Sequence, residues 1–323
     1  MPEAQAPTLP SPHPGEGDLR GKILMAGRPF RFGVVAAQAR SGDEWAEKAR
    51  RIESIGYSTL LMPDGLQYTL APLPALTAAA MATRTLRVGT YVLANDYRNP
   101  VQLAKDAATV DLLSGGRFEL GIGVGRPDAA DDNRALGIPF DSGAVRVARL
   151  AESLALLKVL LSGQPATATG QHYAAVNAQI SPRPVQQPQP PILVAGSKRR
   201  LLELAAREAD IIALGIPPAE TGAGVAERIG WIRDAAGSRF DQLELNLNLM
   251  AVGQQVPRYI ASQMGLTAES LARSGAVAAL TGTTDEMVEA LQRRREKFGI
   301  SYIAVGDELM EGLAPVVERL AGR

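Results

Sequence analysis

Polar side chains stand directly after two apolar runs in the first third of the chain. Asp64 follows the run 59–62, and the segment 95–99 (Asn-Asp-Tyr-Arg-Asn) follows the run 86–93. A carboxylate in such a position can accept hydrogen bonds, and the groups of 95–99 can hold a polar ring system and an anion. The same residues would also suit a Pro-Asp-Gly turn and a capped helix start. A binding site and a pair of solvated turns are therefore both open here.

Glycines and basic residues follow the next two apolar runs. Glycines alternate over 121–125, which would let a flat ligand approach the backbone closely, although the spacing is not that of a dinucleotide fingerprint. The segment 196–200 (Gly-Ser-Lys-Arg-Arg) opens a predicted helix, whose N-terminal N–H groups favour an anion. Three cations oppose the helix dipole unless a phosphate or acidic tail binds among them. A solvated charged turn is the alternative.

The segments that position these residues alternate between apolar runs and amphipathic stretches. The runs are continuously apolar, as in strands that are buried on both faces of a parallel sheet. We expect Asp43 to cap the helix 44–55 and Gly56 to end it. The predicted strands are 31–36, 59–62, 86–93, 117–124, 192–195, 210–214, 243–252 and 302–305, and the helices between them include 72–82, 100–113 and 145–161.

Eight strand–helix units with no polar linker between them predict one domain over residues 29–323. The predicted fold is α/β, a (β/α)8 TIM barrel with insertions after strand 4 and before strand 5. A doubly wound sheet is the alternative fold. In a barrel, the active site forms at the carboxyl ends of the strands, where all the polar segments above would meet.

Composition narrows the chemistry. The 323 residues include 34 Lys or Arg and 34 Asp or Glu, so no basic nucleic-acid surface is expected. Because the chain has no cysteine, disulfides and thiolate chemistry are excluded. The only histidines, His13 and His172, lack partners at metal-ligand spacing, so we expect no metal site.

The segment 1–28 is rich in proline, glycine and charge and lacks the apolar core of a signal peptide. We predict that it is a disordered leader. No run is long and apolar enough to span a bilayer, so a cytoplasmic location without membrane or nucleic-acid partners is expected. The expected partner is a small-molecule substrate.

Taken in order, several segments resemble the luciferase-like monooxygenase superfamily, and within it the F420-dependent oxidoreductases. The similarity runs from about residue 31 to residue 214. Its pieces are RFGV at 31–34, IESIGYSTLLMPD at 52–64, LRVGTYVLANDYRNPVQLAKDAATVDLLSGGRFELGIGVG at 86–125, PPILVAGS at 190–197 and AREADII at 206–212.

The resemblance implies a barrel, usually a homodimer, that binds coenzyme F420, with FMN as the alternative cofactor. By the family's pattern, Asp64 contacts the deazaflavin ring and Tyr91-Val92 resembles a non-proline cis peptide that backs it. The glycine-rich strand end lines the pocket, and Gly196 with Ser197 holds the phosphate. The implied cofactor-binding residues are Asp64, Tyr91, Val92, Asn95, Gly121, Gly123, Gly125, Gly196, Ser197 and Lys198.

Three positions depart from the family's pattern. Relatives often have His after the Asp, where this chain has Gly65, and the sugar-phosphate dehydrogenases have Glu where it has Arg126. The phosphate turn is one glycine short at 195–197. Since the alcohol-oxidising relatives use that His as base and that Glu as acid, we expect no alcohol oxidation by their route.

The remaining residues suit hydride transfer from reduced F420 to an activated C=C or C=N bond. Arg126 or Asn95 would polarise the acceptor's carbonyl, and Tyr97, Tyr68 or water would return the proton. The predicted catalytic residues are Asp64, Tyr68, Tyr97 and Arg126. An FMN-dependent monooxygenase and a non-catalytic cofactor-binding family member are the alternatives. The sequence leaves the substrate, the direction of hydride transfer and the dimer interface open.

Overall fold

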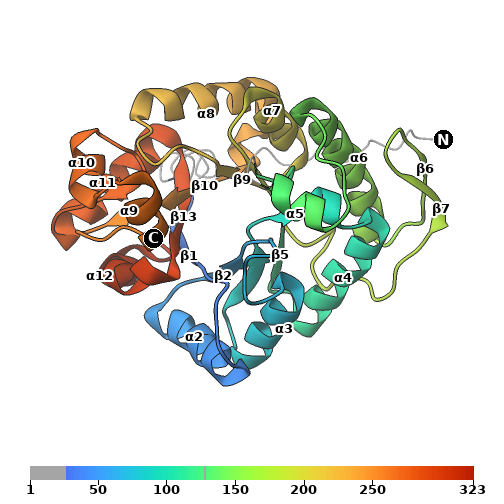
Figure 1. Ribbon diagram of the computed structural model, residues 1–323, viewed down its shortest axis with the longest axis horizontal. Coiled ribbons are helices and arrows are strands. Elements are labelled where there is room, and N and C mark those ends of the chain that lie inside the picture. Colours follow the sequence, from blue (N-terminus) through green and yellow to red (C-terminus); the bar gives the residue numbers. More distant parts are fainter. Residues whose placement is uncertain (1–26, 127–128) are drawn as a thin grey trace, which may run out of the picture.

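The computed structural model describes residues 27–126 and 129–323 (Figure 1). The predicted leader therefore lies outside the described residues, except for its last two. Arg28, one of these two, donates from its guanidinium to the backbone oxygens of Asp241 (3.3 Å) and Gln242 (2.5 Å). These contacts tie Arg28 to the folded part, and the leader itself stays a prediction.

Parallel strands close into a barrel at the centre of the described residues. The strand order is β3-β2-β1-β13-β10-β9-β8-β5-β4, and an added β3–β5 pairing joins the two ends of the sheet. Because β3 and β4 are two halves of one strand, the barrel has eight strands, as predicted. The segments are β1 (Arg31–Val35), β2 (Thr59–Met62), β3 (Arg87–Thr90), β4 (Leu93–Ala94), β5 (Phe118–Gly123), β8 (Ile192–Gly196), β9 (Ile211–Leu214), β10 (Glu244–Leu249) and β13 (Ile300–Gly306).

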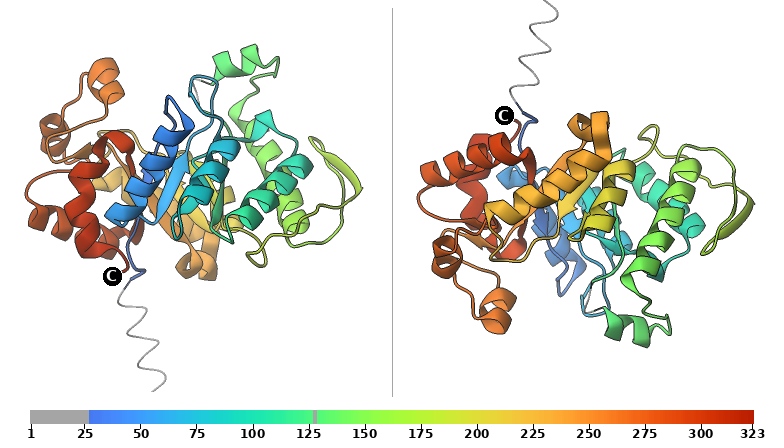
Figure 2. Two further views of the ribbon diagram at one scale, coloured as in Figure 1. Left: turned by 90° about the horizontal axis from the view of Figure 1, so that it is seen from below. Right: turned by 90° about the horizontal axis from the view of Figure 1, so that it is seen from above.

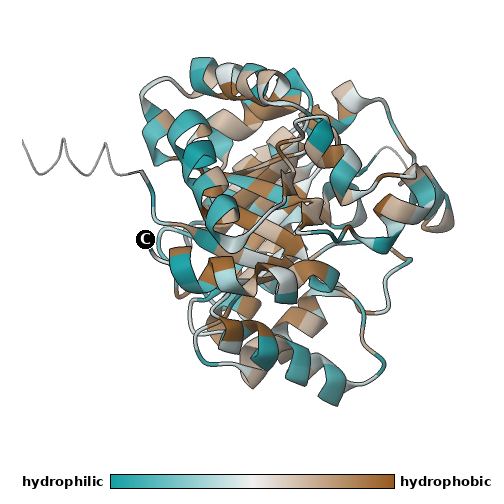
Figure 3. Cartoon of the chain, turned by 90° about the vertical axis from the view of Figure 1, so that its left-hand side faces the viewer, coloured by the Kyte–Doolittle hydropathy of each residue, from teal (hydrophilic) through white to brown (hydrophobic). Residues whose placement is uncertain are grey.

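Helices surround the barrel in Figure 1 and shield the outer faces of its strands. Polar residues colour the outside of these helices in Figure 3, whereas the strands within are apolar. Both sides of each strand are thus removed from water, which explains the continuous apolar runs. The main helices are α2 (Gly42–Ile55), α3 (Pro72–Ala82), α4 (Pro100–Leu113), α6 (Gly143–Leu161), α7 (Arg199–Glu208), α8 (Gly222–Ala236), α11 (Thr284–Phe298) and α12 (Met310–Leu320).

Smaller elements interrupt the repeat. One short helix, α5 (Ala130–Ala135), lies between β5 and α6, and the hairpin of β6 (Ala166–Thr169) and β7 (Ala174–Ala178) lies between α6 and β8. The connection after β10 carries β11 (Ala251–Val252), α9 (Arg258–Met264), α10 (Ala268–Arg273) and β12 (Ala279–Leu280). The 3₁₀ helices are η1 (Asn95–Tyr97), η2 (Gly237–Gln242) and η3 (Asp307–Leu309).

Local details differ from the prediction at two element boundaries. Helix α2 is capped by Ser41, whose side chain accepts a hydrogen bond from the Glu44 N–H, so the Asp43 cap was wrong. Asp43 instead lies in the first turn, where its charge complements the helix dipole. Gly56 ends the helix with φ 98°, as expected. The predicted strand 243–252 divides into β10 and β11.

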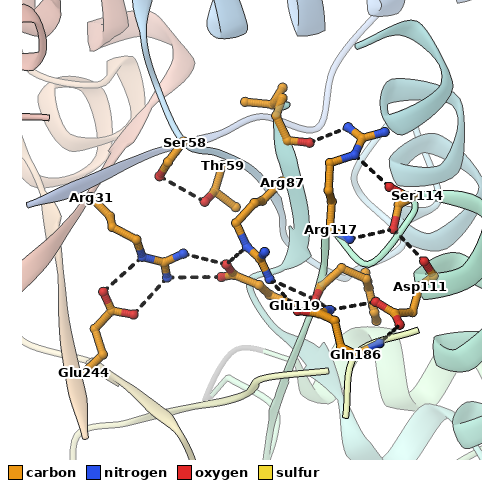
Figure 4. A network of polar contacts seen from close by, with 12 residues as sticks. Arg31, Ser58, Thr59, Arg87, Asp111, Ser114, Arg117, Glu119, Gln186 and Glu244 are labelled. Atoms are coloured by element: carbon orange, nitrogen blue, oxygen red, sulfur yellow. Dashed lines mark hydrogen bonds and ion pairs between the residues drawn. The ribbon is translucent and has the colours of Figure 1, made fainter. Parts of the chain in front are cut away.

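A charged network occupies the N-terminal end of the barrel (Figure 4). The Glu119 side chain is 1% exposed and lies 2.7 Å from Arg31 Nη1 and 2.5 Å from Arg87 Nε. Arg31 also pairs with Glu244 at 2.9 Å. Burial alone would raise the pKa of Glu119, but the two guanidinium groups outweigh it and hold that pKa below its usual value. A cavity of about 480 Å³ opens beside this network.

That cavity lies at the wrong end for barrel chemistry, since it is lined by residues at the starts of strands. Its own charges also satisfy one another, as the Arg31 and Arg87 contacts show. We infer that the charged residues at this N-terminal end stabilise the fold, and that the active site lies at the opposite, C-terminal end of the barrel. Within the described residues, no helix combines the length and apolar character needed to cross a bilayer.

Candidate active site

The connections that follow the strands gather at one end of the barrel. Both views in Figure 2 place α5 and the α9–α10 segment at the end opposite to the C-terminus. The strands are parallel, so this end also receives Asp64 after β2 and the η1 turn after β4. The residues singled out from the sequence therefore converge at the C-terminal mouth.

The third strand breaks at Tyr91-Val92, which is a cis peptide bond, as the family resemblance led us to expect. The Tyr91 N–H donates to Met62 O (2.6 Å), and its hydroxyl donates to Asn246 Oδ1 of β10 (2.6 Å). Tyr91 thereby joins three strands below the mouth. Burial raises the pKa of its phenol, which stays protonated at neutral pH.

The strand-end glycines have a structural explanation. A Cβ on Gly121 would overlap the carbonyl oxygen of Thr90, and one on Gly123 would lie 2.8 Å from Val92 Cγ2. The chain's own third strand fills this space, so strand packing accounts for these two glycines, and their contact with a flat ligand stays a prediction. Gly125 differs, because it has φ 80° and follows the strand.

Asp64 is held by Arg98, a partner that the sequence did not reveal. Its Oδ2 accepts from Arg98 Nη1 (2.6 Å) and from the Ala94 N–H (3.0 Å), and its Oδ1 lies 3.3 Å from Arg98 Nη2. The Asp64 side chain is only 7% exposed. This bidentate pair fixes the β4–η1 turn against the end of β2.

Asn95 offers an unused acceptor at the same turn. The residue is buried, and its Nδ2 donates to the hydroxyl of Tyr173, which precedes β7 in the insertion (3.1 Å). Its Oδ1 is buried without a hydrogen-bond partner among the described residues. An orphaned amide oxygen is a place where a bound molecule could supply an N–H donor.

Three of the predicted catalytic residues come together. Arg126 Nη1 donates to the Tyr68 hydroxyl (3.1 Å), which joins the connections after β5 and β2. Tyr97 lies within electrostatic reach of the same group: burial raises the pKa of its phenol, Asp132 and Asp64 add to the rise, and Arg126 opposes it. The Leu66 N–H donates to Asp132 Oδ2 (3.2 Å), which brings α5 to the cluster.

Tyr259 of α9 is a further candidate site residue, which the sequence analysis missed. Burial, Tyr68 and Glu308 together raise the pKa of its phenol, and its hydroxyl donates to Met250 Sδ at 3.3 Å. Tyr259 lies almost 200 positions after Tyr68 in the chain, and no motif surrounds it. Only the closure of the barrel brings the two phenols together.

The start of α7 carries the predicted anion site. Lys198 occupies the N-cap position with no side-chain cap, and Lys198, Arg199 and Arg200 are exposed. Arg199 also pairs with Glu203 one turn later. Gly196 is packed tightly, since a Cβ there would lie 2.9 Å from the Leu201 side chain. The donors and charges suit a phosphate, although helix packing already accounts for this glycine.

These features define a (β/α)8-barrel protein whose candidate site residues lie at the C-terminal mouth. The sequence profile of the luciferase-like monooxygenase family matches residues 29–257, and the chain belongs to this family.

Relatives support the assignment. An F420-dependent glucose-6-phosphate dehydrogenase of Beutenbergia cavernae is 34% identical over 166 residues, which cover 49% of this chain and 48% of that protein. The match thus spans about half the length of this relative. A coenzyme F420-dependent tetrahydromethanopterin reductase from Methanopyrus kandleri has a similar structure (TM-score 0.73, 16% identity, 90% of this chain and 98% of that chain). A monooxygenase from Streptomyces bottropensis is also similar (TM-score 0.68, 23% identity, 90% and 97%). Both structures share the fold.

Proposed function

We propose that this chain is an F420-dependent oxidoreductase that reduces an activated C=C or C=N bond of a small organic substrate. The observation that carries the proposed reaction is the Arg126–Tyr68 hydrogen bond of 3.1 Å at the mouth, beside Tyr97. The choice of cofactor is supported by the sequence similarity to enzymes named as F420-dependent.

The residues at the mouth fit a deazaflavin. Asn95 Oδ1 is a buried acceptor that an N–H of the ring can satisfy. The uncapped start of α7, with Lys198 and its basic neighbours, suits the phosphate of the coenzyme. The Tyr91-Val92 turn and Asp64 would flank the ring. We also propose, from the family resemblance, that the protein works as a homodimer in the cytoplasm.

When bound in reduced form, the deazaflavin supplies a hydride to the substrate. The protein must then return a proton and stabilise the negative charge that develops on the acceptor. Tyr68 suits the first task, because its oxygen accepts from Arg126 and its own hydrogen remains free to be donated. Arg126 places positive charge beside it for the second task, and Tyr97 is a second protonated phenol.

Reduction is favoured because the mouth offers neutral donors where the alcohol-oxidising relatives have a base. The place after Asp64 is Gly65, and the Gln67 side chain fills the space that a side chain at Gly65 would need. An amide neither takes up nor releases a proton near neutral pH. Gln67 therefore suits hydrogen bonding to a carbonyl rather than proton abstraction from an alcohol.

Calorimetric titration with F420 and, separately, with FMN tests the proposal. We expect saturable F420 binding and no FMN binding. Tight binding of FMN alone would overturn the cofactor assignment in favour of a monooxygenase. Binding of neither cofactor would overturn the enzymatic proposal altogether.

A further inference from the structure

Exposed apolar side chains lie on several of the connections that follow the strands at the C-terminal mouth. Single exposed apolar residues are ordinary, but here five belong to only three connections, those after β2, β5 and β11. We call this set the mouth rim. It consists of Leu66 (56% exposed), Leu136 (42%), Phe140 (36%), Tyr259 (45%) and Met264 (52%).

Several contacts hold the three connections around one opening. The Leu66 N–H donates to Asp132 Oδ2 of α5 at 3.2 Å, and burial and then the charge of Tyr68 raise the pKa of the Tyr259 phenol. Phe140 is anchored at the end of β5, because Arg146 stacks on its ring at 4.2 Å and donates to the carbonyl oxygen of Val124 at 2.6 Å. The rim therefore belongs to connections that lie at the same end of the barrel as the Arg126–Tyr68 pair.

The mouth has few cations left for an anionic substrate. A phosphate ester carries close to two negative charges and is normally held by several Arg or Lys groups. Five of the basic residues described near the mouth pair with carboxylates, whereas Arg126, which contacts Tyr68, and the exposed Lys198, Arg199 and Arg200 at the start of α7 belong to the proposed proton-transfer and cofactor sites. The pairs are Arg98–Asp64 (2.6 Å), Arg149–Asp96 (2.9 Å), Arg258–Glu308 (3.4 Å), Lys48–Asp307 (2.6 Å) and Arg40–Glu44 (3.0 Å).

From these two observations we infer that the hydride acceptor is an uncharged, ring-containing apolar compound with a conjugated carbonyl, and that it is not a sugar phosphate. The apolar body lies against the mouth rim, and its carbonyl oxygen accepts from Tyr68. Such a site is mostly apolar with a few placed polar groups, as small-molecule sites usually are. The inference rests on the proposed function, which supplies the hydride, and it names the acceptor class.

Binding of two probes to the purified protein tests this class. Coumarin is a neutral ring compound with a conjugated carbonyl, and glucose 6-phosphate is the sugar phosphate named in the relatives. We expect calorimetry to show saturable binding of coumarin and none of glucose 6-phosphate, with or without F420. Leu66→Ser and Phe140→Ser should each weaken coumarin binding about fivefold, because apolar contact area is lost.

The matched control is Val176→Ser, since Val176 is 87% exposed on β7 and outside the mouth rim. It should leave coumarin affinity unchanged, and all three variants should keep the wild-type melting temperature. Saturable binding of glucose 6-phosphate, or coumarin binding that neither rim variant weakens, would overturn the inference. The F420 titration is an independent test. Binding of F420 without binding of coumarin would contradict only the inferred class of hydride acceptor. Binding of coumarin without binding of F420 would contradict the proposed function.

Discussion

Gly121 lies directly against the backbone of Thr90, so that a Cβ on Gly121 would overlap the Thr90 carbonyl oxygen. The two residues are also hydrogen-bonded twice: Thr90 Oγ1 donates to Gly121 O (2.7 Å) and accepts from the Gly121 N–H (2.8 Å). Through this close contact, the segment between β3 and β4 packs against β5. The position of the Tyr91-Val92 turn at the mouth thus depends on a missing side chain.

Gly121→Ala should lower the free energy of unfolding by about 3 kcal/mol, because a methyl group has no space beside Thr90. Urea unfolding followed by circular dichroism measures the change. Gly143→Ala is the control: nothing lies within 4 Å of a Cβ there, at the start of α6, so no loss is expected. Equal stability of the Gly121→Ala protein and the wild type would show that the contact is looser than described.

Arg98→Ala should leave the Asp64 carboxylate without its ion pair in a site that is 7% exposed. Removing one partner of a buried pair costs about 3 kcal/mol of unfolding free energy, because the other charge stays desolvated. Urea unfolding again provides the measurement. Arg273→Ala removes an exposed pair with Glu269 (72% and 81% exposed) and should cost less than about 1 kcal/mol. Similar losses in the two variants would contradict a special role for Arg98.

Acid stability should depend on Glu119. Its pKa is lowered in the folded protein, since Arg31 and Arg87 outweigh the effect of burial. The carboxylate therefore contributes stability that is fully present above its unfolded pKa of about 4.3 and is lost as the pH falls through the lower folded value. Glu119→Gln should be less stable at neutral pH and should lose less stability on acidification below about pH 4.3.

Unfolding free energies measured from pH 7 to acid pH check this slope. Glu269→Gln, an exposed carboxylate paired one turn away with Arg273, is the matched control and should follow the wild type. A Glu119→Gln protein with the full acid dependence of the wild type would mean that other carboxylates account for it.

Tyr68→Phe removes the proposed proton donor but keeps the ring. It should lower kcat about 100-fold while F420 affinity stays unchanged, as expected for a group that transfers a proton. Arg126→Ala should have an effect of similar direction, because it removes the partner of the Tyr68 oxygen. Single-turnover oxidation of reduced F420 with a conjugated ketone as acceptor measures both. Unchanged turnover in the two variants would refute these roles.

The sequence by itself determined the repeat. Helices 72–82 and 100–113 begin and end where predicted, since each starts at a proline that suits a first helical turn. The eight strands lie at the predicted apolar runs, because strands buried on both faces of a parallel sheet are mostly apolar. The cis peptide at Tyr91-Val92 was foreseen only from the family resemblance.

Only the tertiary structure decided which residues contact one another at the candidate site. The Asp64–Arg98 pair, the contact of Leu66 with Asp132 and the approach of Tyr259 to Tyr68 depend on how the connections lie after the barrel closes. It also showed that Gly121 and Gly123 pack closely against the chain's own third strand. Local sequence patterns report which face of a segment is buried, whereas these contacts join residues that are distant in the chain and meet only through barrel closure.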